Sequence, residues 1–191
     1  MKSLTNYILE GANVEDRTYD RFFGDKLNRH RDIKTDISKS MMELKKYKSE
    51  FSSEEYKMLE ELIDNRFSKY RDNRSYVDMG SYYDKKEDHE YLTFSFSFYM
   101  NNFPKAVMNQ IDKGVTRKFP NIKIKCNLNS FGTTQSFYGD IYYMNKDKGS
   151  NADVIDAIKE ILSTIKPIYK DLIEFKDDDA DRDEVNRRKR G

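Results

Sequence analysis

Apolar residues recur at intervals of three and four through the first part of the chain, which predicts amphipathic helices. One apolar stripe covers residues 14–48, with an interruption near Gly24. A second helix is predicted to begin at Ser52, because Ser52 and Glu55 have the spacing of a capping box. The polar stretch 71–90 then predicts a loop, with room for a short edge strand.

The hydrophobic period changes to two in the second half of the chain, which predicts β-strands. Residues 90–100, EYLTFSFSFYM, alternate large apolar side chains with Tyr, Thr and Ser. Two further alternating segments, 121–128 and 135–144, flank the turn SFGTT and predict a hairpin. A helix with Pro104 in its first turn precedes this hairpin, and a helix capped by Ser150 follows it. The sequence therefore predicts an α+β fold, with N-terminal helices followed by a β-α-β-β-α unit and a small antiparallel or mixed sheet.

Composition and charge narrow the classes of protein that need to be considered. Charged residues make up 36% of the chain and hydrophobic residues 37%, so the core is small, although 14 Tyr and 12 Phe partly compensate. A net charge of +1 provides no bulk attraction to nucleic acid. The single cysteine, Cys126, excludes an intrachain disulfide and a cysteine-rich zinc site. No apolar run has membrane-spanning length, so we expect no membrane partner.

The first residues, MKSLTNYILEG, combine a docking face with an accessible bond. Leu4, Tyr7 and Ile8 share one face of a helical turn, and short amphipathic turns of this kind bind in apolar grooves. Glu10 is followed by Gly11, a residue that gives a protease easy access to the backbone.

This segment resembles the capsid-targeting peptide of internal proteins of T-even-like and other large tailed phages. Leaders of that family open with Met, Lys and a hydroxyl residue, and the prohead protease cuts after Glu when Leu or Ile stands two residues earlier. The resemblance implies docking through Leu4, Tyr7 and Ile8. It also implies a processing site formed by Ile8, Glu10 and Gly11, with cleavage between the last two.

The resemblance to these leaders covers residues 1–11 and implies a phage-encoded, non-enzymatic protein of the virion head, whether internal, injected or part of the capsid core. Its partners would be a capsid or prohead core protein and the prohead protease. Its locations would be the virion and the host bacterial cytoplasm, where such proteins act on host defences. The expected organisation is a leader at 1–13, one α+β domain at 14–175 and a charged, disordered tail at 176–191. The alternative is an ordinary N-terminal helix packed on the domain.

A second candidate site is the outward face of the predicted sheet, where tyrosines and lysines alternate with the core positions. Aromatic rings stack on bases and lysines contact phosphates, and β-α-β-β-α is part of the RNA-recognition plait, although the aromatic motif of that family is absent. The alternative function is therefore a nucleic-acid- or protein-binding module. Equally, the N-terminal helices could cover this face, or the tyrosines could reflect strand preference alone. The residues of the expected face are Tyr91, Tyr99, Lys123, Lys125, Tyr138 and Tyr142.

Residues that carry catalysis or bind metals are sparse. His30 and His89 do not have the spacing of a zinc site, and Cys126 is predicted to face inward within a strand. We therefore expect no enzyme, no metal and no cofactor. An enzyme would require a cleft that brings His89 together with distant carboxylates.

Overall fold

The computed structural model describes residues 25–66, 74–131, 134–143 and 150–175. Contacts divide the chain into one unit of residues 1–36 and a second of residues 37–191. The expected leader, its boundary at residue 13 and the expected tail at 176–191 lie outside the described residues. The fold described below is that of the second unit.

The described elements confirm an α+β fold of helices and one antiparallel sheet. Both predicted caps are present: Ser52 Oγ accepts from Glu55 N at 3.3 Å, and Ser150 Oγ accepts from Asp153 N at 3.3 Å. In chain order the elements are α2 (Asp25–Lys46), η2 (Lys48–Glu50), α3 (Ser53–Asn65), β1 (Tyr76–Asp84), β2 (His89–Asn101), α4 (Lys105–Asn109), the π-helical η3 (Gln110–Val115), α5 (Thr116–Lys118), β3 (Ile122–Phe131), β4 (Thr134–Tyr143), α6 (Asn151–Ile165), η4 (Lys166–Ile168) and α7 (Tyr169–Glu174).

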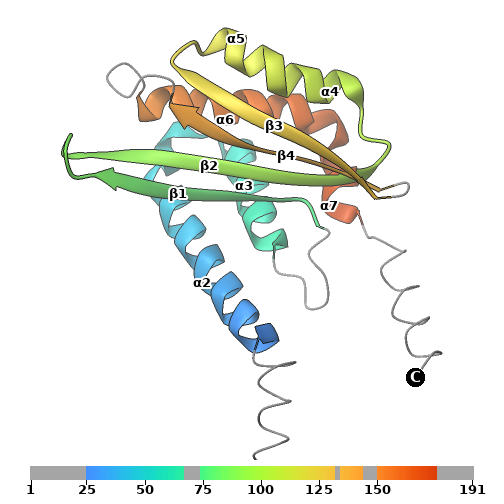
Figure 1. The fold of residues 1–191 in the computed structure, drawn as a ribbon, viewed down its shortest axis with the longest axis horizontal. Coiled ribbons are helices and arrows are strands. Elements are labelled where there is room, and N and C mark those ends of the chain that lie inside the picture. The colour runs from blue at the N-terminus through green and yellow to red at the C-terminus, as the bar shows by residue number, and fades with distance from the viewer. Residues whose placement is uncertain (1–24, 67–73, 132–133, 144–149, 176–191) are drawn as a thin grey trace, which may run out of the picture. The chain divides into compact units, whose positions relative to one another are not determined.

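The four strands lie in the order β1-β2-β4-β3, and each neighbouring pair is antiparallel. It follows that β2 and β3 run parallel to each other with β4 between them. The helical segment α4–η3–α5 connects them, so β2, β3 and β4 form a split β-α-β unit. Strand β1 is added beside β2 as a hairpin partner (Figure 1).

The stretch 71–90, predicted as a loop with room for a short edge strand, contains the nine-residue edge strand β1, and its last two residues begin β2, so the loop is shorter than predicted. Only Val77 and Met79 of β1 are buried apolar residues. The residues between and directly after these two are of types that are depleted in strands or neutral toward them: Asp78, Gly80 and Ser81.

The free edge of β1 is held by side chains from α2 and α3. Ser40 Oγ accepts a hydrogen bond from Met79 N at 3.3 Å and donates one to Asp78 Oδ1 at 3.2 Å. Asn65 Nδ2 donates to Ser75 O at 2.7 Å, and Arg66 forms an ion pair with Asp78. These contacts supply the partners that an edge strand lacks.

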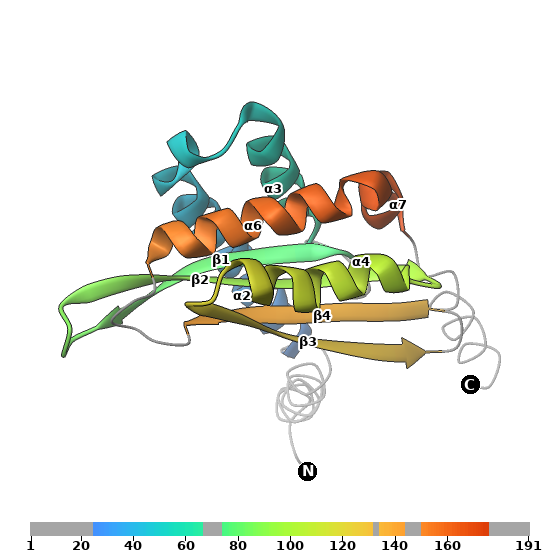
Figure 2. The ribbon, with the colours of Figure 1, turned by 90° about the horizontal axis from the view of Figure 1, so that it is seen from above.

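The core lies between one face of the sheet and the helices. Figures 1 and 2 show α3, α6, α7 and the α4–α5 segment on this face. Phe96 of β2 packs on Gly139 of β4, its partner in the register. A Cβ atom at Gly139 would lie 2.9 Å from Phe96 Cζ, so the absent side chain makes room for the ring. The buried core residues of β2 are Leu92, Phe94, Phe96, Phe98 and Met100.

Candidate functional site

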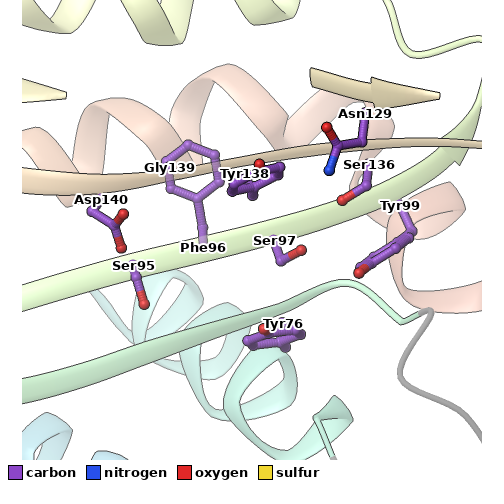
Figure 3. Close-up of a pocket in the computed structure, with 10 residues that line it drawn as sticks. All are labelled: Tyr76, Ser95, Phe96, Ser97, Tyr99, Asn129, Ser136, Tyr138, Gly139 and Asp140. Carbon is purple, nitrogen blue, oxygen red and sulfur yellow. The ribbon is translucent and has the colours of Figure 1, made fainter. Parts of the chain in front are cut away.

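The opposite face of the sheet carries a groove framed by three tyrosines from three strands. Tyr76 comes from β1, Tyr99 from β2 and Tyr138 from β4, and all three are half-buried (Figure 3). Tyr76 and Tyr138 both pair with Ser97 in the register, one from each side of β2. The groove has a volume of about 360 Å³.

The depth of the groove follows from side-chain size. The sequence FSFSF places phenylalanines on the core face and Ser95 and Ser97 on this face. Ser136 of β4 lies opposite Tyr99. Ser97 is 7% exposed and Ser136 4%, because the larger rings beside them limit access to these short side chains.

Charge on this face is distributed along two strands. Lys123 and Lys125 of β3 are both exposed, and Lys125 lies opposite Asp140 of β4 in the register. On the other side, the guanidinium of Arg66 lies over the ring of Tyr76 at 5.2 Å from its centroid. Cations therefore lie on both sides of the groove, with Asp140 opposite Lys125 and with Arg66 already in an ion pair with Asp78.

As the alternating pattern predicts, one face of the sheet carries Tyr99, Tyr138, Lys123 and Lys125. This face, called the open face below, is the one turned away from α3, α6 and α7 among the described helices (Figure 2). Of the other expected face residues, Tyr142 belongs to β4, but its side chain lies outside the described residues.

Tyr91 departs from the expected exposed row. Its side chain is 4% exposed and packs edge-on against Tyr143, with ring centroids 5.0 Å apart, and against His89, with centroids 4.6 Å apart. Its hydroxyl donates to Glu87 in the hairpin turn. The alternation that places Tyr99 at the surface fails at Tyr91 because neighbouring rings enclose that end of β2.

Sequence reasoning missed Tyr76, Ser95, Ser97, Ser136 and Asn129 as parts of the site. Tyr76 was missed because the short edge strand allowed within residues 71–90 was given neither bounds nor a register. The two serines of β2 carried a usable signal, since the FSFSF pattern already places them on the face opposite the phenylalanines.

A polar network ties the far end of β2 to α6. The side-chain oxygen of Asn151 accepts hydrogen bonds from Leu92 N and from the Tyr143 hydroxyl, each at 2.8 Å. Its amide nitrogen donates to Glu90 O at 2.9 Å and to the Tyr47 hydroxyl at 3.3 Å. Burial raises the pKa of Tyr143, so its hydroxyl remains a donor. Asn151 of α6 thereby contacts β2, β4 and Tyr47, the residue that follows α2.

The groups with reactive potential lie apart from the groove. Burial raises the pKa of Cys126 to about 12, which keeps this thiol protonated near neutral pH. His89 is exposed at the start of β2. In the described part of the chain, no three His, Cys, Asp or Glu side chains are grouped to hold a metal ion. The leader residues Leu4, Tyr7, Ile8, Glu10 and Gly11, and the side chain of His30, lie outside the described residues.

Among the described helices, none has the length and apolar character needed to span a bilayer. No protein family model matches this chain, and no curated protein and no solved structure shows significant similarity to it.

Proposed function

We propose that residues 37–175 form a non-enzymatic binding module that holds single-stranded nucleic acid on the open face of its sheet. The observation that carries this proposal is the groove framed by Tyr76, Tyr99 and Tyr138, with Lys123 and Lys125 exposed on the adjoining edge strand. Rings and cations on one sheet face are the two elements that bind unpaired bases and their phosphates.

In this proposal the tyrosines, the serines and the lysines each have a separate role. The half-buried rings of Tyr99 and Tyr138 stack on bases. The hydroxyls of Ser95, Ser97 and Ser136 donate to or accept from base edges at the floor of the groove. Lys123 and Lys125 contact phosphates as the strand leaves the groove. With two lysines, the logarithm of the affinity is expected to fall with the logarithm of the salt concentration with a slope of about −1.4.

Fluorescence anisotropy with labelled single-stranded RNA and DNA of mixed sequence tests this proposal. Tyr138→Ala is expected to raise Kd roughly 5- to 150-fold, the loss of one base stack. The matched control is Tyr82→Ala, since Tyr82 is 53% exposed on the β1–β2 hairpin and does not line the groove. Lys123→Ala with Lys125→Ala is expected to flatten the salt dependence. Absence of binding, or equal losses for Tyr138→Ala and Tyr82→Ala, would contradict the proposal and favour a protein ligand for this face.

We also propose that residues 1–11 direct the protein to a phage virion head, where it serves as an internal, injected or capsid-core protein. The support is the order of Met1 to Gly11, which resembles the leader family. A host protein as target after injection belongs to this proposal as well. The targeting proposal is compatible with the binding module, because in it residues 1–11 direct the protein to the virion, whereas the groove binds the ligand.

Intact-mass spectrometry of the protein from purified virions tests the targeting proposal. We expect a mass that begins at Gly11. Glu10→Gln is expected to leave packaging intact and abolish cleavage, whereas Leu4→Ala with Tyr7→Ala is expected to abolish packaging. Complete absence of the protein from virions, with full-length protein in infected cells, would reject this proposal and leave the binding proposal standing.

A further inference from the structure

The two outer strands of the sheet differ in how their edges are covered. On the outer edge of β1, Met79 N donates to Ser40 Oγ, and Ser75 O, just before the strand, accepts from Asn65 Nδ2. In the described part of the chain, β3 pairs with β4 on one side and with no strand on the other. The ten residues of β3 therefore present a template for a further strand.

The sequence of β3 is nearly symmetric about Cys126. On the open face of the sheet, Lys123 and Lys125 precede Cys126, and Asn127 and Asn129 follow it. On the core side, Ile124 and Leu128 stand at equal distances from the same centre. A strand with this pattern is complementary to an antiparallel copy of itself.

Charge decides which register two such strands can adopt. Consider two antiparallel copies of β3 related by a two-fold axis. If the axis is centred at Ile124, Lys123 of each copy lies opposite Lys125 of the other. If it is centred at Lys125, the two copies of Lys125 lie opposite each other. Like charges directly opposite each other destabilise a strand pair. A centre at Cys126 instead places Lys125 opposite Asn127 and Lys123 opposite Asn129.

The same register explains the exposure of Leu128. This side chain is 44% exposed although it points to the core side of the sheet, where Ile124 is only 2% exposed. A centre at Cys126 brings Leu128 of each copy beside Ile124 of the other, and so removes apolar surface from water. Centres further along β3 oppose Ile124 or Cys126 to Ser130, or leave Ile124 without an apolar partner, whereas a centre at Cys126 opposes Ser130 only to Ile122, at the end of the paired segment.

We propose that two copies of this chain pair antiparallel through β3, with the two-fold axis at Cys126. The two four-stranded sheets become one sheet of eight strands. A two-fold axis perpendicular to the sheet keeps both open faces on the same side, so the two tyrosine grooves lie on one continuous surface. This pairing does not depend on what the grooves bind.

Sedimentation equilibrium of the full chain over a dilution series tests the dimer, and charge variants test its register. Asn127→Lys places a lysine opposite Lys125 of the other copy at two symmetric positions, and is expected to raise the dimer Kd about 2- to 30-fold. Adding Lys125→Glu turns both contacts into opposite-charge pairs and is expected to restore dimerisation to at least the original affinity. Thr93→Lys, which adds the same charge at an exposed position of central strand β2, is the matched control and is expected to leave Kd unchanged.

Each alternative result overturns the proposal. A chain that stays monomeric at every concentration has no such interface. A dimer that is insensitive to Asn127→Lys uses another surface. A dimer weakened by Asn127→Lys but not restored by Lys125→Glu does not have the register centred on Cys126. Circular dichroism of each variant checks that the fold is retained, which is expected because positions 93, 125 and 127 are exposed.

Discussion

Replacing Gly139 by alanine is expected to destabilise the protein, although alanine is normally preferred to glycine within a strand. The added Cβ would lie 2.9 Å from Phe96 Cζ, 2.9 Å from Lys125 O and 3.1 Å from Cys126 Sγ. The carbonyl of Lys125 belongs to the paired backbone of β3 and cannot retreat without disturbing the ladder. The Phe96 ring is 2% exposed and enclosed by Phe94, Phe98 and Phe137.

The magnitude follows from two opposing terms. Overpacking a filled core costs about 1–3 kcal/mol, whereas replacing glycine by alanine recovers about 0.4–1 kcal/mol of chain entropy. Over most of these ranges the clash outweighs the entropy, so we expect a net loss of up to about 2.6 kcal/mol in the free energy of unfolding. Gly80→Ala is the matched control, because its Cβ would meet only the side-chain oxygen of Thr93, at 3.1 Å. That hydroxyl rotates away, so the variant is expected to be neutral or slightly stabilising.

Urea denaturation followed by circular dichroism measures both variants. A second test combines Gly139→Ala with Phe96→Leu, which removes the ring from the contact. If the ring is a main cause of the loss, the two substitutions are non-additive and the double variant is more stable than the sum of the two losses predicts. Equal stability of Gly139→Ala and Gly80→Ala would refute the reasoning, and strict additivity with Phe96→Leu would assign the loss to the Lys125 carbonyl alone.

Two further predictions concern the buried polar groups. Asn151→Ala is expected to cost roughly 1–3 kcal/mol of unfolding free energy, because the Leu92 N–H loses its acceptor in a buried position, and thermal denaturation measures the loss. For Cys126, burial raises the thiol pKa from 9.0 to about 12, so the folded chain keeps a proton that the unfolded chain releases. This contribution to stability is complete below pH 9 and is lost as the pH rises toward 12. Urea titrations across that range, compared with Cys126→Ser, measure the effect, and a steeper decline in the variant would contradict it.

The sequence predicted strand β2 and the faces of its residues well, because the FSFSF alternation is a local signal. Ser97 and Tyr99 therefore lie where the alternation places them, on the face opposite Phe96 and Phe98. The two capping boxes were predicted for the same reason, since each depends on residues three positions apart.

For strand β1 the sequence indicated only room for a short edge strand, because the support of this strand is not local. Met79 N donates to Ser40 of α2, which lies 39 residues earlier, and Ser75 O, just before the strand, accepts from Asn65 of α3. No pattern within residues 76–84 predicts these bonds. The groove could not be predicted without Tyr76 of this strand. The burial of Tyr91 likewise depends on Tyr143, a residue brought beside it only by the pairing of β2 with β4.

The split β-α-β arrangement also has a consequence for the order of folding. Strands β1 and β2 are joined by a short turn, and only two residues separate β3 from β4 along the chain, so each antiparallel pair closes a short loop at low entropic cost. The pairing of Phe98 with Phe137 is different, because the whole α4–α5 segment and strand β3 separate these residues along the chain. Pairing of this kind is slow, since the entropic cost of closing the loop comes before the stabilising contacts form. We expect the rate-limiting step of folding to be the docking of the two hairpins along the β2–β4 seam, the seam across which the tyrosine groove is assembled.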